Sequence, residues 1–247
     1  MKELNIKSST IEKGLELAKE FVNKLISPAI EETGLLISDN IKLLRFRQQI
    51  KILLKAKNYV EKNGIKTDVI PMKILVPLLE KCSLEEDEEL QNKWATLLAN
   101  MADSENNLKN QIFPYLLSQI SIEEYNALKD LEAVENGHFE TAKKLREMRA
   151  QDNFSFNAET RKLTEEVNKV NQEGFTIFLD EFEIENLKRL GLVRELPPKI
   201  LIDELQIENS YDKMDNWYQL EAEYDTDNFG YRLTELGEKF LLITADS

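Results

Sequence analysis

The residues most able to do chemistry are basic side chains on one predicted helix, from about residue 40 to residue 63. Lys51, Lys55 and Lys62 share a face of that helix because they are 4 and 7 residues apart. Such a face could bind nucleic acid, anionic lipid or an acidic protein. We favour instead a solvated face that partly pairs with the chain's own acidic run at 85–89, because charge runs usually keep helices soluble. The candidate anion or partner surface comprises Lys42, Arg45, Arg47, Lys51, Lys55 and Lys62.

The other reactive groups form no catalytic or metal-binding pattern. His138 is the only histidine, without a Ser, Cys or paired carboxylate at a diagnostic spacing, and we expect it to cap a helix or to be exposed. Cys82, the only cysteine, is interpreted as a small packing residue. The acids at 85–89 would point in different directions on a helix, whereas metal ligands must converge. We therefore expect no catalytic residue, no metal, no cofactor and no enzymatic activity.

The element next to these groups is a strongly patterned helix. Ser83 and Glu86 form an S-x-x-E capping box, which predicts a helix start at Ser83. The acids at 85–89 would then lie at the positive end of the helix dipole. The apolar residues recur at helical spacing and predict a core face on which Trp94 is buried; they are Leu90, Trp94, Leu97, Leu98 and Met101.

Start and stop signals divide the rest of the chain into helices and a few strands. The N-terminal helices are expected at about 11–26, 29–36, 40–63, closed by Gly64, and 71–81, opened by Pro71. Ser121 and Glu124 form a second capping box. The later segments are expected to be helices at 113–120, 121–134, 139–150, 158–171 and 180–190, ended by Gly191, strands at 192–193, 199–207 and 231–233, and a last helix capped by Thr234.

These elements predict a mainly α protein of two domains. Residues 1–111 form an N-terminal helical domain, and residues 112–247 form a C-terminal winged-helix-like α+β domain. The second domain carries a charged helical insertion at 135–175 and an acidic loop at 203–227. A helix, a strand, an acidic loop, a returning strand and a closing helix make the outline of a winged helix.

Several motifs resemble those of the Abi-alpha (abortive infection alpha) family of bacterial proteins. They are ILVPLLE at 74–80, SLEEDEELQNKWATLLAN at 83–100, the basic stretch LRFRQQIKILLKAKNYVEKNGIK at 44–66, and YRLTELGEKFL at 231–241. The resemblance implies a role in defence against phage. It supplies no settled catalytic residues to carry over.

The charge distribution limits the kinds of partner that the chain can bind. The net charge is −14, yet residues 1–70 hold 13 Lys and Arg against 9 Asp and Glu. Residues 113–247 hold 15 basic and 29 acidic residues, and the helix that would enter DNA carries Asp180, Glu181, Glu183 and Glu185. Because these acids repel phosphates, we expect no DNA binding by this domain and interpret it as a protein-contact module.

The chain has no run of eighteen apolar residues, no apolar signal-peptide core and a single cysteine, so we expect a cytoplasmic location. The segment 11–37 lacks the lysine-rich polar face of a membrane-surface helix. We interpret the protein as a non-enzymatic phage-defence factor that acts through protein contacts, with self-association into a homodimer compatible with its apolar helices. The alternatives are a nucleic-acid-binding regulator that uses the basic helix 42–66, and a membrane-perturbing effector.

Overall fold

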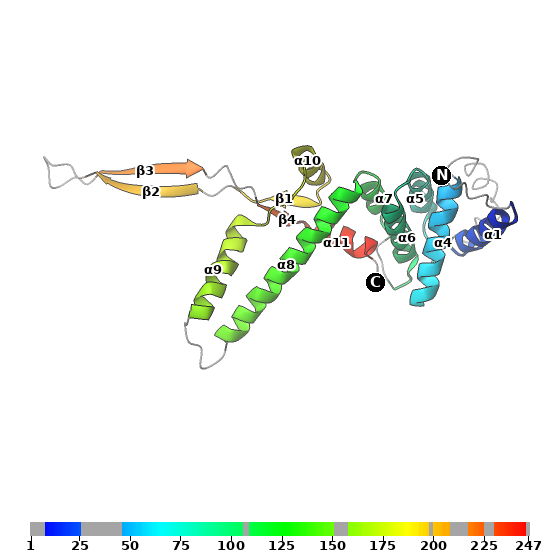
Figure 1. Ribbon diagram of the computed structural model, residues 1–247, viewed down its shortest axis with the longest axis horizontal. Coiled ribbons are helices and arrows are strands. Elements are labelled where there is room, and N and C mark those ends of the chain that lie inside the picture. The colour runs from blue at the N-terminus through cyan, green and yellow to red at the C-terminus, as the bar shows by residue number, and fades with distance from the viewer. Residues whose placement is uncertain are drawn as a thin grey trace, which may run out of the picture. The chain divides into compact units, whose positions relative to one another are not determined.

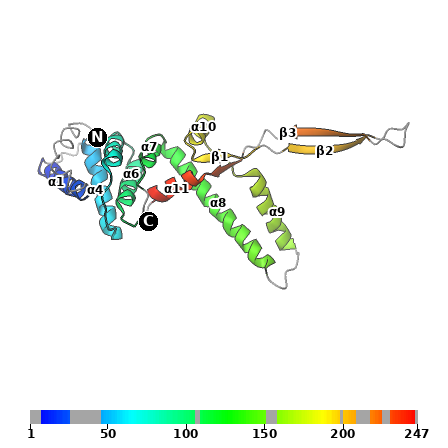
Figure 2. The same ribbon diagram turned by 180° about the vertical axis from the view of Figure 1, so that it is seen from behind.

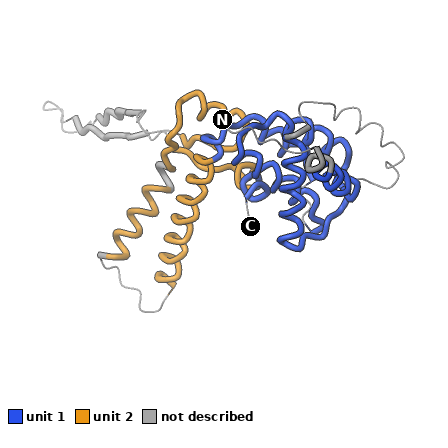
Figure 3. Tube along the Cα trace, turned by 45° about the vertical axis from the view of Figure 1, so that its right-hand side comes forward, with its two compact units in different colours: residues 1–125, 239–247 blue, residues 126–238 orange. Residues whose placement is uncertain are grey.

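The computed structural model describes residues 8–25, 46–105, 109–150, 158–197, 200–207, 217–224 and 230–245, and these are mainly helical (Figure 1). The chain divides into two compact units (Figure 3). Unit 1 comprises Met1–Tyr125 and Lys239–Ser247, and unit 2 comprises Asn126–Glu238. The sequence places its domain boundary at 111, within unit 1. Each unit is described by itself.

Unit 1 is a stack of helices around a leucine-rich core. α1 packs against α4, α4 packs against α6, and α5 contacts α4, α6 and α7. The helices of this unit are α1 (Ser8–Leu25), α4 (Phe46–Asn63), α5 (Met72–Cys82), α6 (Glu88–Ala102) and α7 (Ile112–Leu117), together with most of α11 (Glu235–Thr244). The predicted helices at 11–26, 71–81 and 113–120 are thereby confirmed. The predicted helix at 29–36 lies outside the described residues.

The end of α4 follows the predicted signal. Gly64 has a φ of 63°, and the amide of Ile65 donates to the carbonyl of Val60 over 3.0 Å. This is the Schellman arrangement, in which a glycine in the left-handed region closes the helix. The predicted stop at Gly64 is confirmed. The expected start near residue 40 falls among residues that are not described.

The predicted capping box at Ser83 and Glu86 is wrong. α6 begins at Glu88, and its N-cap is Asp87, whose Oδ1 accepts from the amide of Leu90 at 2.8 Å. Ser83 instead ends α5, where its hydroxyl donates to the carbonyl of Glu80. Two good N-cap residues lie four positions apart, and the last turn of α5 already uses the first. Of the acids at 85–89, only Glu88 and Glu89 therefore lie in the first turn of α6.

The apolar face of α6 is where the spacing predicts it. The Trp94 side chain is 1% exposed, so its predicted burial is confirmed. The other members of the stripe, also buried, are Leu90, Leu97, Leu98 and Met101.

Unit 2 combines two long helices with short strands. Its helices are most of α8 (Ile122–Arg149), α9 (Ala158–Glu173) and α10 (Glu181–Arg189). Its strands are β1 (Val193–Glu195), β2 (Ile200–Ile207), β3 (Trp217–Tyr224) and β4 (Tyr231–Leu233) (Figure 2). β1 pairs antiparallel with β4, Val193 opposite Leu233, and β2 pairs antiparallel with β3, Ile200 opposite Tyr224. The strands predicted at 199–207 and 231–233 and the helices at 158–171 and 180–190 are confirmed.

The expected acidic loop at 203–227 is wrong over much of its length. Residues 203–207 continue β2, and residues 217–224 form β3. The second of these segments reads WYQLEAEY, and its aromatic residues favour a strand despite the acids between them.

The expected break between helices at 121–134 and 139–150 is also wrong, because α8 is continuous. A glycine inside a helix costs only about 1 kcal/mol, which good helix formers on both sides of Gly137 offset. The capping box at its start is confirmed: the Ser121 amide donates to the Glu124 carboxylate at 2.7 Å, and the Glu124 amide donates to the Ser121 hydroxyl at 3.1 Å. The expected break at 152–157 lies outside the described residues.

Two further local signals are confirmed in unit 2. Gly191, with a φ of 71°, ends α10. The Thr234 hydroxyl accepts from the amide of Gly237 at 3.0 Å and caps α11. Gly237 lies so close to β1 that a Cβ there would stand 2.2 Å from the carbonyl oxygen of Leu192.

Candidate functional site

Part of the predicted basic surface is paired inside unit 1. The Lys51 and Lys55 ammonium groups lie 3.6 and 3.7 Å from the Glu88 carboxylate, and Lys55 also donates to the Asn92 side chain at 2.6 Å. Burial and the neighbouring Lys51 lower the pKa of Lys55, and Glu88 opposes them. The α4 cations thus meet the acidic start of α6.

Of the other four members of that surface, the structure describes the side chain of Lys62 only. Lys62 lies in the last turn of α4. Arg47 belongs to α4, but its side chain is outside the described part, as are Lys42 and Arg45 altogether. Of the six candidates, the structure therefore brings two together on one acidic partner.

The single cysteine is a packing residue. Cys82 is fully buried at the end of α5, and its thiol donates to the Leu79 carbonyl at 3.4 Å. Burial raises the pKa of this thiol, which keeps it protonated at neutral pH. The sequence interpretation of Cys82 is confirmed.

The prediction that His138 caps a helix or is exposed is wrong. His138 lies inside α8 and is partly buried. Its imidazole meets the Phe175 ring edge-on, with 6.0 Å between ring centroids. The reason is tertiary: the segment after α9 covers this part of α8.

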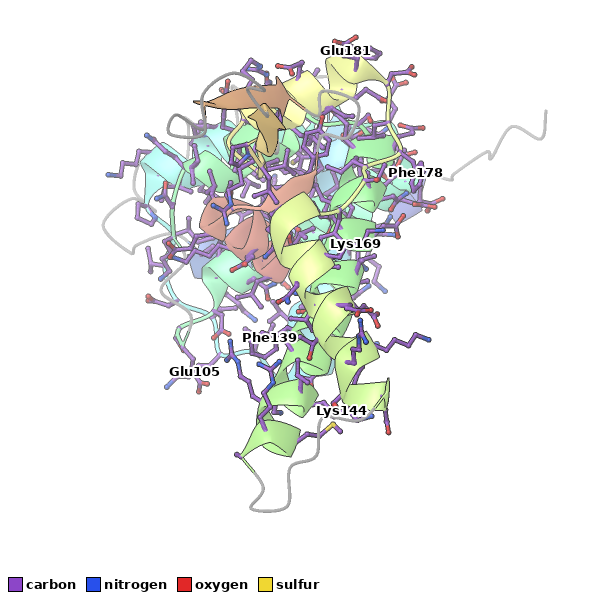
Figure 4. The ribbon with its side chains drawn as sticks, turned by 90° about the vertical axis from the view of Figure 1, so that its left-hand side faces the viewer. Glu105, Phe139, Lys144, Lys169, Phe178 and Glu181 are labelled. Atoms are coloured by element: carbon purple, nitrogen blue, oxygen red, sulfur yellow. The ribbon has the colours of Figure 1, made fainter. Side chains whose placement is uncertain are left out.

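His138 lines a cleft of about 480 Å³ within unit 2, between α8 and α9. The α8 side chains that line it recur every three or four residues, so they form one helix face. Phe139 is labelled on α8 in Figure 4. The lining residues are Glu135, Asn136, His138, Phe139, Ala142, Leu145, Arg146 and Arg149 of α8, Val167 and Asn168 of α9, and Phe175, Arg232 and Glu238.

Arg232 of β4 is fixed at one end of the cleft. Its Nη2 donates to the carbonyl of Val170 at 2.9 Å, and its guanidinium carbon lies 5.9 Å from the centroid of the Phe175 ring. Its Nε is buried and has no hydrogen-bond acceptor among the described residues. A buried donor without an acceptor is costly, and such groups usually meet a water or a ligand.

Glu135 lies at the same end and is engaged with the backbone. Its carboxylate accepts from the amide of Leu233 at 2.9 Å. Burial raises the pKa of Glu135, while the Leu233 hydrogen bond and the charge of Arg232 act in the opposite direction. Glu135 therefore anchors α8 to β4.

Arg149 is held at the other end. Its Nη2 donates to the hydroxyl of Thr164 at 3.0 Å, and that hydroxyl donates to the Thr160 carbonyl at 2.7 Å. Arg146 lies one turn before it on the same face. Between the two ends, the buried side chains of Leu145 and Val167 give the cleft an apolar wall.

The amino-acid sequence does not predict this cleft. One local signal was present: Phe139, Ala142, Arg146 and Arg149 recur with helical spacing. No local signal joins them to Phe175 or to Arg232, which is more than eighty residues further along the chain.

No described helix is long and apolar enough to cross a membrane. Among the residues that the structure describes, no group of three or more His, Cys, Asp or Glu side chains is placed to hold a metal ion.

Comparison with known proteins supports the resemblance carried by the motifs. No curated protein and no solved structure matches the chain. A family model described as abortive infection alpha matches residues 38–244, which is most of the chain. The chain therefore belongs to the abortive infection alpha family.

Proposed function

We propose that the protein is a phage-defence factor of the abortive-infection type, which acts in the cytoplasm through protein contacts and without catalysis. The observation that carries the proposal is the family match over residues 38–244. The segments at 83–100, 44–66 and 231–241, whose motifs resemble those of this family, support the same role.

The surface that best fits a protein partner lies at the start of α10. Phe178 is 91% exposed and Phe182 is 72% exposed, and the two rings are four residues apart. The acids around them are Asp180, Glu181, Glu183 and Glu185. Figure 4 labels Phe178 and Glu181 in this region. Exposed aromatic rings inside a charged rim are typical of an interface hot spot, so the partner would offer an apolar pocket bordered by basic groups.

The same helix bears on the winged-helix interpretation. α10, β1, the β2–β3 hairpin, β4 and α11 follow one another in the order of a winged helix, with the hairpin as the wing. We propose that arrangement as a protein-binding module. Its would-be recognition helix has four acids at or near its first turn, and these would repel DNA phosphates.

A phage challenge of bacteria that express the chain tests the proposal. We expect the wild-type protein to lower plaque numbers and Phe178→Ala with Phe182→Ala to abolish that protection. Both rings are exposed, so the double variant should melt like the wild type. Val134→Ala, which shortens a 51% exposed side chain on α8, is the control and should protect normally.

Each failure has a separate meaning. A wild-type protein that protects against no phage in a broad panel contradicts the defence role. Full protection by the double phenylalanine variant contradicts the contact surface only. Tight duplex binding at physiological salt that is lost on reversing Lys51, Lys55 and Lys62 would favour the nucleic-acid-binding regulator instead.

A further inference from the structure

We propose that the cleft between α8 and α9 binds a small organic anion with a flat ring and a phosphate group, of the size and chemistry of a nucleoside monophosphate. This inference stands on unit 2 alone and does not depend on the proposed protein contacts. It accounts for three features that packing leaves unexplained: the cleft's volume, its fixed arginines and its open aromatic ring.

The volume suits a small molecule. Ligand sites in proteins usually enclose about 300–1,000 Å³, and this cleft measures about 480 Å³. Its lining is more polar than that of most such sites, because charged and polar side chains outnumber the apolar ones, and this composition suits a charged ligand. Ala142, Leu145 and Val167 contribute the apolar part.

The arginines supply the anion contacts. Arg146, Arg149 and Arg232 line the cleft against two carboxylates, Glu135 and Glu238. Glu135 already accepts from the Leu233 amide. A guanidinium presents a planar fork of donors that matches the oxygens of a phosphate. Arg149 is held by Thr164 and Arg232 by Val170, so little side-chain freedom is lost when an anion binds.

The rings supply the contact for a flat group. Phe139 lines the cleft although its side chain is 60% exposed, and an apolar ring left so open gains from being covered. Phe175 and His138 form a second aromatic surface in the same cleft. A base could stack on these rings while its phosphate meets Arg146 and Arg149 at the other end of the cleft.

His138 gives a direct readout in the full-length protein. It is the only histidine, so the imidazole C–H signals in a proton NMR spectrum belong to the cleft alone. The probes are AMP, GMP, CMP and UMP, with adenosine and inorganic phosphate as partial ligands. We expect a saturable shift with at least one monophosphate at physiological salt, and weaker binding of adenosine and of phosphate because each lacks one half of the contacts.

Matched variants separate the cleft from general charge. Arg146→Gln and Arg149→Gln should each weaken binding about tenfold, as expected for the loss of a charge-assisted hydrogen bond. Lys144→Gln removes the same charge from a residue of α8 that does not line the cleft, because its spacing from Ala142 and Arg146 places it on another face of the helix, and it should leave binding unchanged. All three side chains are exposed, so the variants should melt like the wild type.

Three results would overturn the inference. The first is the absence of a saturable His138 shift with every monophosphate. The second is an equal weakening by Lys144→Gln, which would reduce the effect to net charge. The third is binding of inorganic phosphate as tight as that of the best monophosphate, which would show that the ligand's ring contributes nothing to binding.

Discussion

The two units differ in how much of their apolar surface they bury. In unit 1, α6 buries one side chain after another against α4, α5 and α7, among them Trp94, Leu97, Leu98 and Met101. In unit 2, the described side chains of α9 include only Thr160 and Val167 as buried residues. Large rings at Phe139, Phe178 and Phe182 are open to solvent there.

This difference separates stability from recognition. A helix that buries a full stripe contributes most to the free energy of folding, because burial of apolar area is the dominant favourable term. A helix pair that leaves a cleft and exposed rings contributes less to folding and has surface left for a ligand or partner. We therefore expect substitutions in unit 1 to act on folding, and substitutions at the open rings of unit 2 to act on function.

The largest expected effect is in the core of unit 1. Trp94→Ala should lower the free energy of unfolding by about 3–5 kcal/mol, because a fully buried aromatic side chain would leave a cavity. Phe139→Ala in unit 2 should change it by less than about 1 kcal/mol. Chemical denaturation of both variants measures the contrast. A Trp94→Ala protein that unfolds like the wild type would show that the comparison is wrong.

Gly237→Ala tests a place in unit 2 where the backbone is closely packed. The added Cβ would stand 2.2 Å from the carbonyl oxygen of Leu192. This oxygen belongs to the backbone, so it cannot move aside as the end of a flexible side chain can. Overpacking of this kind costs about 1–3 kcal/mol. Gly137→Ala is the control, since its Cβ would meet nothing within 4 Å and alanine favours the helix. A melting temperature of Gly237→Ala at or above that of Gly137→Ala would contradict the close approach.

Local signals could be predicted from the sequence because they need only neighbouring residues. Gly64 and Gly191 end helices, and Ser121 with Glu124 starts one, through hydrogen bonds that span a few positions. The same rule failed at Ser83 because Asp87, four residues later, offered an equally good cap. Local rules name the candidates, and tertiary packing selects among them.

The cleft could not be predicted because its parts meet only in three dimensions. Arg149 depends on Thr164, and Arg232 depends on Val170 and Phe175. The sequence shows one helix face of the cleft and gives no indication of its other wall. The basic helix was easier, because the opposed charges of Lys51 and Glu88 already suggest pairing.

Glu88→Gln tests the paired cations of unit 1. The variant should lose less than about 1 kcal/mol of stability, since Lys51, Lys55 and Glu88 are near the surface and exposed pairs are weak. The difference from wild type should shrink in high salt, where surface charges are screened. Thermal melts at low and high salt measure it, with Glu89→Gln as the neighbouring control. A loss that is large or independent of salt would mean that Glu88 has a structural role beyond the ion pair.

The smallest effects are expected in acid, where one carboxyl of each unit titrates in the opposite sense. In unit 1, the Lys109 ammonium, 2.5 Å from Asp68, holds the pKa of Asp68 below its ordinary value of 3.8. Its contribution to stability is therefore complete above 3.8 and is lost as the pH falls through the lowered pKa.

In unit 2, burial raises the pKa of Glu135 above its ordinary value of 4.5. The protonated form is favoured in the folded state, so its contribution is present below 4.5 and is lost as the pH rises through the raised pKa. Carboxyl NMR titration should place the Asp68 midpoint below the Glu135 midpoint. Asp68→Asn should flatten the decline of stability in strong acid, and Glu135→Gln should flatten the decline above pH 4.5. Midpoints in the reverse order would show that Glu135 is governed by the charge of Arg232 rather than by burial, and that this end of the cleft is more open to water than its packing indicates.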